Sequence, residues 1–236
     1  MIRSVIFDIL FAIWTIFCAI FGLPLGLSKK YAIYLGKFWG NGVLILLKIV
    51  CNIGYSCKNL ETLQNGSFLI LSKHQSAWET IFFLTKIDKV SFVIKEGLLK
   101  VPFYGWYLKN MGMIPVKRSN TIGEMREMNN QILKSLQLGK SVVIFPQGTR
   151  TSPYEKMRYK FGCLEIFKNY SGKVALIALN SGLLWPKGFG IKNAGRVEVE
   201  ITNIININQN TNIIQTKEDI ESEIHAKSLS LWRNKP

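Results

Sequence analysis

Negative charge, histidine and cysteine are all scarce in this chain. Its 236 residues carry 15 Asp and Glu against 30 Lys and Arg, a net charge of +15, with only two histidines and four cysteines. Two histidines argue against a zinc site built from imidazole ligands. The cysteines show neither paired ligand spacing nor the density of a disulfide framework. We therefore expect no metal site, and reduced thiols that face a reducing compartment.

Blocks of like charge are missing as well. The basic excess is spread along the chain, without the run of about five or six that would form a tail for nucleic acid. Charged residues make up 19% of the chain and hydrophobic residues 48%, a balance that excludes intrinsic disorder and favours contact with a membrane. We therefore expect an anionic membrane surface, and no nucleic acid, as a partner.

The first part of the chain is the most hydrophobic. Residues 9–28 carry no charge, and as a helix they would reach roughly 30 Å, about the hydrocarbon thickness of a bilayer. A second apolar stretch, Phe38–Tyr55, is interrupted only by Lys48. The sequence therefore predicts a membrane-attachment segment of two helices over residues 1–58. Its simplest arrangement is a hairpin that enters and returns on the cytoplasmic side, and a single span is the alternative.

Two other interpretations of this segment compete with the membrane. A cleaved signal peptide is disfavoured, because Asp8 stands where a basic region is required and no small-x-small cleavage site follows. An ordinary buried core helix is the stronger alternative, because Trp14 and Phe17 would pack well in any core. Two hydrophobic segments in succession favour the membrane.

Residues 59–236 predict an α/β domain. Short runs typical of strands alternate with helical patterns, which indicates a mixed, mostly parallel sheet flanked by helices. The expected strands are 67–72, 90–94, 112–116, 141–145, 174–179 and 196–201, and the expected helices are 77–84, 122–138, 164–169 and 217–232, the last with Thr216 as N-cap. Four strands are apolar almost throughout, as in strands covered on both faces, whereas 196–201 alternates and is expected at an edge or half exposed.

The segment Ser72–Thr80 concentrates groups that can transfer a proton. His74 follows an apolar strand, and Glu79 lies five residues later. Five residues of continuous helix would leave the two side chains about 140° apart, so they meet only if His74 lies in a loop and Glu79 in the first helical turn. Ser76 and Glu79 fit a capping box that would start the helix there. A carboxylate on one ring nitrogen leaves the other free as a general base, although a Glu79 that only caps and a His74 without a role are the simpler alternatives.

A second polar segment follows the strand 141–145. Gly148 permits close approach of a backbone, and Thr149 and Arg150 add a hydroxyl and a planar guanidinium. Together these groups suit a phosphate. The alternative is a strand-to-loop turn that carries an exposed arginine.

Taken in order, these segments resemble the motifs of the glycerophospholipid acyltransferases, in particular the bacterial 1-acylglycerol-3-phosphate acyltransferases, from about Ser67 to Leu179. The first family motif, His-x4-Asp, is matched by His74–Glu79. The second, a basic residue, Pro-x-x-Gly and a Gly-led strand ending in Arg, is matched by Lys95–Arg118. The third, Phe-Pro-Glu-Gly-Thr-Arg, is matched by Phe145–Arg150, and the fourth, an apolar strand with prolines, is matched poorly by Val174–Leu179.

The resemblance implies acyl transfer from a thioester, on coenzyme A or acyl carrier protein, to the sn-2 hydroxyl of lysophosphatidate, which gives phosphatidate in phospholipid biosynthesis. His74 would be the general base, and Glu79 would orient it. The residues implied in binding the substrate phosphate are Arg118, Gly148, Thr149, Arg150 and Lys95. No cofactor is implied beyond the acyl-CoA or acyl-ACP co-substrate, and the enzyme would work at the inner membrane with its catalytic domain on the cytoplasmic side.

Two positions depart from the family motifs. Glu79 replaces Asp, which keeps the charge and adds a methylene, and Gln147 replaces Glu, which removes a charge. A missing negative charge beside a phosphate site should not weaken anion binding. The alternatives left open are another lysolipid acceptor, such as a lyso-ornithine lipid or a lysophospholipid, and a catalytically silent lipid-binding homologue. His225, in the polar C-terminal helix, is expected to be a solvated bystander.

Overall fold

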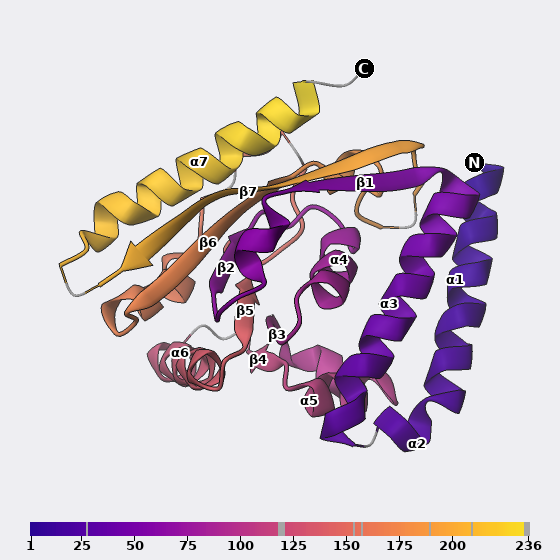
Figure 1. Cartoon of the computed structure of the whole chain (residues 1–236), viewed down its shortest axis with the longest axis horizontal. Helices are drawn as coiled ribbons and strands as arrows, with labels where there is room; N and C mark the ends of the chain where they lie inside the picture. The colour runs from indigo at the N-terminus through magenta and orange to yellow at the C-terminus, as the bar shows by residue number, and fades with distance from the viewer. Residues whose placement is uncertain are drawn as a thin grey trace.

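The chain begins with a hairpin of apolar helices. The computed structural model describes residues 1–26, 28–117, 121–152, 154–156, 158–188, 190–208 and 210–233. Helix α1 (Ile2–Phe21), the short α2 (Leu23–Gly26) and α3 (Lys29–Cys51) form the hairpin, which stands at one side of the molecule (Figure 1). Helix α3 ends at Cys51 because Asn52 adopts the left-handed conformation and donates its backbone N–H to the Leu47 carbonyl.

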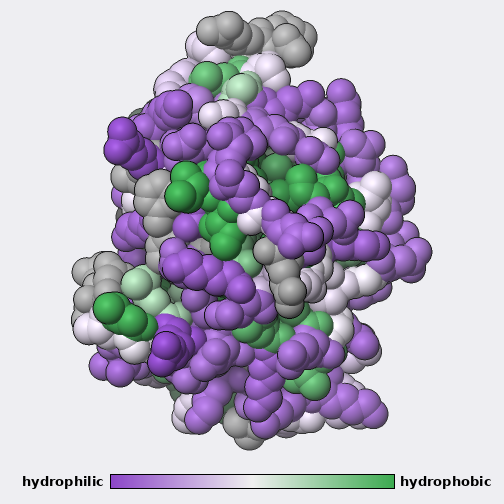
Figure 2. Space-filling model, turned by 90° about the vertical axis from the view of Figure 1, so that its left-hand side faces the viewer, coloured by the Kyte–Doolittle hydropathy of each residue, from purple (hydrophilic) through white to green (hydrophobic). Residues whose placement is uncertain are grey.

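The hairpin helices keep most of their apolar surface outside the core. Both are long and apolar enough to cross a membrane, yet only 17% of the α1 window and 22% of the α3 window are buried. An ordinary core helix would be mostly buried, so this alternative is not supported. Soluble proteins rarely expose this much apolar surface, so the hairpin favours membrane association. Figure 2 shows the contrasting face on the far side of the molecule from the hairpin, where hydrophilic residues cover most of the surface.

Small residues let α3 lie close to its neighbours. A Cβ atom on Gly42 would lie 2.4 Å from the Trp14 ring of α1, and one on Gly36 would lie 2.8 Å from the Met111 sulfur. The two helices of the hairpin are also joined by indole hydrogen bonds, from Trp14 Nε1 to the Trp39 carbonyl (2.9 Å) and from Trp39 Nε1 to Thr15 Oγ1 (3.1 Å). The hairpin is therefore a packed part of the structure rather than a loose tail.

The rest of the chain builds one seven-stranded sheet in the order β1-β7-β6-β2-β5-β3-β4. Its strands are β1 (Ile53–Lys58), β2 (Leu69–Ser72), β3 (Val90–Lys95), β4 (Ile114–Val116), β5 (Ser141–Ile144), β6 (Gly172–Leu179) and β7 (Gly195–Ile207). All neighbouring pairs are parallel except β6 and β7, which are antiparallel. The predicted mixed, mostly parallel sheet is confirmed.

Helices cover both faces of the sheet. The hairpin, α4 (Trp78–Lys86) and α5 (Tyr104–Met111) share one core with Ile70 and Val143. Helices α6 (Ile122–Gln137) and α7 (Ile213–Arg233) share the other core with Leu69 (Figure 1). Successive residues of β2 therefore enter opposite cores, which explains why the central strands are apolar throughout.

Several boundaries differ from the sequence-based expectations. Strand β1 pairs with β7, so the sheet begins at Ile53, before the predicted boundary between residues 58 and 59. Strand β7 is half exposed as expected but lies between β1 and β6 rather than at an edge. Helix α7 begins before Thr216, with the Asn212 side chain accepting from the Gln215 backbone N–H (3.2 Å). The helix expected at 164–169 is a 3₁₀ helix, Phe161–Lys168.

Candidate active site

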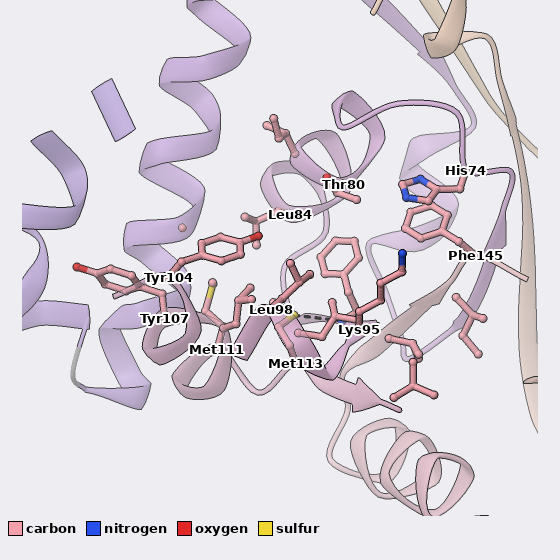
Figure 3. Close-up of a pocket in the computed structure, with 18 of the residues that line it drawn as sticks. His74, Thr80, Leu84, Lys95, Leu98, Tyr104, Tyr107, Met111, Met113 and Phe145 are labelled. Carbon is pink, nitrogen blue, oxygen red and sulfur yellow. Dashed lines mark hydrogen bonds between the residues drawn. The ribbon is translucent and has the colours of Figure 1, made fainter. Parts of the chain in front are cut away.

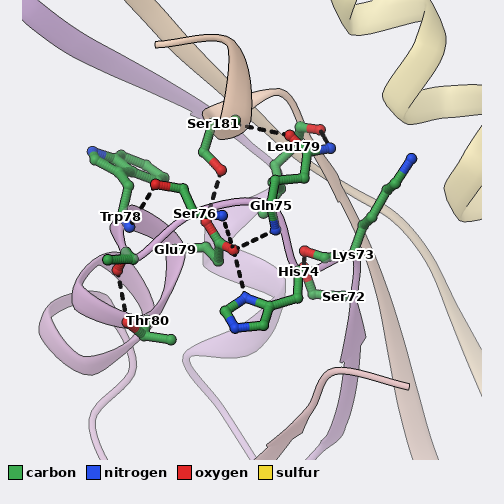
Figure 4. A network of polar contacts seen from close by, with 12 residues as sticks. Ser72, Lys73, His74, Gln75, Ser76, Trp78, Glu79, Thr80, Leu179 and Ser181 are labelled. Atoms are coloured by element: carbon green, nitrogen blue, oxygen red, sulfur yellow. Dashed lines mark hydrogen bonds and ion pairs between the residues drawn. The ribbon is translucent and has the colours of Figure 1, made fainter. Parts of the chain in front are cut away.

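His74 and Glu79 meet at the carboxyl end of β2. His74 lies in the loop between β2 and α4, and Glu79 lies in the first turn of α4. The His74 Nδ1 atom is 2.7 Å from Glu79 Oε1 (Figure 4). The break between loop and helix that the spacing requires is therefore present. Carboxyl ends of strands are where open α/β sheets place their ligands.

The Glu79 carboxylate is fully buried and held on both oxygens. Oε1 also accepts the backbone N–H groups of Gln75 and Ser76, each at 2.7 Å, and Oε2 accepts the Ser181 hydroxyl at 2.7 Å. The expected capping box forms only in part, because Ala77 rather than Ser76 is the N-cap, and the Ser76 hydroxyl accepts from the Trp78 N–H (3.1 Å) rather than from that of Glu79. Glu79 thus starts the helix and holds the histidine at once.

The His74 ring is fixed by stacking as well. It lies on the Phe145 ring with centroids 4.2 Å apart and planes at 18°. Among the described residues no group hydrogen-bonds His74 Nε2, and the side chain lines the large cavity of the protein. With Nδ1 occupied by Glu79, Nε2 is the nitrogen available to a bound molecule.

Gln147 holds the backbone of His74 rather than a substrate. Its Oε1 accepts the His74 N–H (2.9 Å), and its Nε2 lies 3.5 Å from the Thr151 hydroxyl. The Thr151 N–H donates in turn to the His74 carbonyl (2.8 Å). Gln147 is only 2% exposed. The replacement of Glu by Gln is therefore accommodated by an amide that accepts on one side and donates on the other.

The cavity runs from His74 to the helical hairpin and has a volume of about 1310 Å³. Figure 3 shows His74, Phe145 and Lys95 at one end and the α5 side chains Tyr104, Tyr107 and Met111 at the other. The polar end is lined by His74, Lys95, Lys117, Gly148, Thr149, Arg150 and Lys160. The apolar end is lined by Ile16, Ala19, Ala32, Leu35, Trp39 and Leu108. One continuous space thus joins a basic region, an imidazole and an apolar region.

Four of the five predicted phosphate-binding residues share this cavity with His74. They are Lys95, Gly148, Thr149 and Arg150. The fifth, Arg118, lies outside the described residues. Gly148 has a φ of +68°, and its N–H donates to the Phe145 carbonyl (2.9 Å), which closes the turn after β5. A Cβ atom on Gly148 would lie 3.1 Å from Lys160 Nζ, so the glycine leaves room for a basic side chain that the sequence did not single out.

A buried amine lies behind the site. Lys73 is 1% exposed, and its Nζ donates to the Glu155 carbonyl (3.1 Å) and lies 3.4 Å from His225 Nδ1. Burial lowers the pKa of Lys73 to about 8, although the charge of Glu155 acts in the opposite direction. Burial, followed by the charges of Lys73 and Lys156, lowers the pKa of His225. His225 is therefore not the solvated bystander that we expected.

Besides Lys160, sequence reasoning missed three residues around the His74–Glu79 pair: Gln75, Phe145 as a stacking partner, and Ser181. Ser181 follows β6, which pairs with β2 in parallel. The carboxyl ends of the two strands are therefore adjacent. A polar pair directly after an apolar strand, Asn180 and Ser181, was the available signal.

Comparisons with known proteins show which family the chain resembles. The acyltransferase family model matches residues 55–179. A 1-acyl-sn-glycerol-3-phosphate acyltransferase of Pseudomonas aeruginosa is 31% identical over 204 residues, which cover 85% of this chain and 79% of that protein. One of Saccharomyces cerevisiae is 25% identical over 66% of this chain and 53% of its own length.

A solved structure extends the likeness to the whole fold. The crystal structure of PlsC, the 1-acyl-sn-glycerophosphate acyltransferase of Thermotoga maritima, has a TM-score of 0.81 and covers 100% of this chain and 98% of its own. At 19% identity this shows a common fold, hairpin included. The family match and the relationship to the Pseudomonas protein go further, and they show that the chain belongs to the acyltransferase family.

Proposed function

We propose that the protein is a 1-acyl-sn-glycerol-3-phosphate acyltransferase of phospholipid biosynthesis. It transfers an acyl chain from a thioester to the sn-2 hydroxyl of lysophosphatidate and releases phosphatidate. The observation that carries the proposal is the His74 imidazole, held by Glu79, at the basic end of one cavity that continues to an apolar end. The Pseudomonas and yeast relatives are 1-acyl-sn-glycerol-3-phosphate acyltransferases, which supports the same acceptor.

His74 acts as the general base. Its Nε2 takes the proton of the sn-2 hydroxyl while that oxygen attacks the thioester carbonyl carbon. The carbon–sulfur bond then breaks, and the departing thiolate takes the proton from the imidazolium, so that a free thiol leaves and the imidazole is neutral again. General-base catalysis of this kind contributes on the order of 10²–10⁴-fold. Glu79 keeps the ring in the productive tautomer and stabilises the imidazolium.

The two ends of the cavity bind two different groups, the phosphate of the acceptor and the acyl chain of the donor. Arg150 and the hydroxyl of Thr149 bind the acceptor phosphate together with the Gly148 backbone, since a guanidinium fits two phosphate oxygens at once. Lys95 lines the same cavity, and the family resemblance gives Arg118 a role in binding this phosphate. An acyl chain enters the apolar end, where each buried methylene contributes about 0.8 kcal/mol.

The acyl donor is a co-substrate, either acyl-CoA or acyl-ACP, and no further cofactor takes part. Coenzyme A, acyl carrier protein and the lysophosphatidate acceptor are all anionic. A chain of net charge +15 attracts each of them. A donor assay with both thioesters separates the two possibilities.

The hairpin places the site at the lipid surface. Its apolar outer face enters the cytoplasmic leaflet of the inner membrane, and the catalytic domain remains in the cytoplasm. Basic residues near an anionic leaflet contribute about 1 kcal/mol each, which adds to the apolar contact.

The test is acyl transfer by the purified full chain in detergent micelles, with both thioester donors, for the wild type and for His74→Ala. The expected result is phosphatidate, detected by mass spectrometry, and a loss of about 10²–10⁴-fold in the variant. Activity that survives in a folded His74→Ala protein would overturn the mechanism. Lysolipids without a phosphomonoester are offered in parallel, because their turnover in place of lysophosphatidate would move the acceptor to another lysolipid. Lipid binding without any turnover would indicate a silent homologue.

A further inference from the structure

The second oxygen of Glu79 has a single partner in the described part of the chain. Ser181 Oγ donates to Oε2 at 2.7 Å, and both side chains are 0% exposed (Figure 4). The other oxygen, Oε1, accepts three donors, one of which is His74 Nδ1. Ser181 thus fills the position on the carboxylate that the loop before α4 does not reach.

The turn that carries Ser181 is tied to the rest of the sheet. The Ser181 carbonyl accepts the N–H groups of Leu184 (3.1 Å) and Trp185 (2.9 Å). Its neighbour Asn180 accepts the Glu198 N–H (2.9 Å) and donates to the Leu231 carbonyl (3.1 Å), which joins the turn to β7 and α7. The hydroxyl is therefore delivered by a backbone that has little freedom to move.

The same turn is tied to the loop of His74. Gln75, 1% exposed, donates from Nε2 to the Leu179 carbonyl (2.9 Å) and accepts the Gly182 N–H on Oε1 (3.0 Å). Ser181 and His74 are thus held at a fixed separation on either side of Glu79. The Gln75 side chain thus links the ends of β2 and β6, although Gln75 and Leu179 are 104 positions apart in the sequence.

A glutamate needs this second anchor more than an aspartate does. Its longer side chain has one more rotatable bond, and a carboxylate oxygen buried without a donor is strongly unfavourable. Without the hydroxyl, rotation of the carboxylate toward other donors would draw Oε1 away from His74 Nδ1. We infer that Ser181 is a positioning residue, whose hydroxyl sets the orientation of the Glu79 carboxylate and, through it, of the His74 ring. The inference rests on the proposed function, in which that ring is the base.

The first test is a double-mutant cycle in the acyl-transfer assay. Ser181→Ala is expected to lower kcat by about ten-fold or more, the effect of one hydrogen bond to a charged group. The KM for lysophosphatidate should stay within about twofold, because Ser181 does not line the cavity. In a Glu79→Asp background the shorter side chain withdraws from the tied Ser181 turn, so the same substitution should change kcat by less than about twofold.

The matched control is Ser91→Ala. Ser91 is also 0% exposed, and its hydroxyl has no hydrogen-bond partner within the described residues. Its removal should leave kcat unchanged, and thermal unfolding of all variants verifies that they are folded. Equal losses in Ser181→Ala and Ser91→Ala, or an equal loss from Ser181→Ala in the wild-type and Glu79→Asp backgrounds, would overturn the inference.

A spectroscopic readout separates this inference from the proposed function. The chain has only two histidines, so ¹⁵N-histidine labelling with a His225→Gln control assigns the proton on His74 Nδ1. The short contact with Glu79 predicts a far-downfield proton signal in the wild type and in Ser91→Ala, and its loss or broadening in Ser181→Ala. An unchanged signal in Ser181→Ala would overturn the positioning role. This result does not depend on turnover, so an inactive wild type would refute the proposed function alone.

Discussion

Removing the charge of Glu79 without changing its shape tests the mechanism most directly. Oε1 accepts three hydrogen bonds and Oε2 accepts one. In Glu79→Gln the amide oxygen can take the place of Oε1 and keep its three donors. The amide nitrogen then faces the Ser181 hydroxyl, which can turn to accept. The variant should therefore keep the geometry and lose only the negative charge.

The contact distance sets the size of the expected effect. With Nδ1 and Oε1 2.7 Å apart, the charge centres of an imidazolium and the carboxylate lie about 4 Å from each other, which corresponds to about 4 kcal/mol at an effective dielectric constant of 20. If half or more of the imidazolium charge has developed in the transition state, the barrier rises by about 2–4 kcal/mol. The expected loss in kcat is then about 30-fold to 1000-fold.

The assay follows release of the free thiol with a chromogenic reagent at saturating lysophosphatidate. Thermal unfolding of Glu79→Gln should match that of the wild type if the four hydrogen bonds survive. A loss in kcat of less than about fivefold in a folded variant would refute the electrostatic role of Glu79. Glu79→Asp, which keeps the charge, is the companion variant and should lose much less activity.

Further substitutions test the surroundings of the site. Burial lowers the pKa of Lys73 from 10.5 to about 8, so between these pH values the unfolded chain holds a proton that the folded chain has lost. The free energy of unfolding, measured with denaturant, should therefore rise with pH across this window by up to about 3 kcal/mol in the wild type, but not in Lys73→Met. Gln147→Leu leaves the His74 N–H buried without an acceptor, so the variant should be less stable than the wild type by about 1–3 kcal/mol and should have a lower kcat. A kcat equal to that of the wild type would show that activity does not depend on this hydrogen bond. Gly42→Leu would force a side chain into the Trp14 ring, so we expect about 1–3 kcal/mol of destabilisation in a thermal scan, and unchanged stability would contradict the packing described. Ala32→Leu fills the apolar end of the cavity and should shift donor preference toward shorter chains in a competition assay, by about 0.8 kcal/mol for each methylene excluded.

The residues of the site differ in how far the sequence could predict them. The His74–Glu79 contact was predictable, because five-residue spacing and a helix start between the two residues constrain each other locally. Ser181 was not, because its contact with Glu79 spans 102 positions and depends on which strand lies beside β2. The role of Gln147 was not predictable either. The sequence placed it beside the phosphate site without a role, whereas its side chain turns inward to the His74 backbone.

The elements of the fold also differ in how far the sequence could predict them. The central strands were predictable, because a strand covered by helices on both faces has a short, almost entirely apolar sequence. The start of the sheet was placed too late because the apolar stretch continues through Cys51 into β1, and hydrophobicity alone does not separate the end of a helix from the start of a buried strand. Asn52, in the left-handed conformation at the junction, was the local signal of that boundary.

The cavity has one wall that belongs to the hairpin. Side chains of α1 and α3 close its apolar end, while the polar end is formed by the sheet and its loops. Under the proposed function, a different membrane anchor grafted onto the sheet would still hold the protein at the lipid surface but would leave the acyl site open. The same two helices therefore determine both how the protein attaches to the membrane and which acyl chains it accepts. Substitutions that fit the hairpin to a thinner or thicker bilayer would also change the fatty acids that the protein installs in that bilayer.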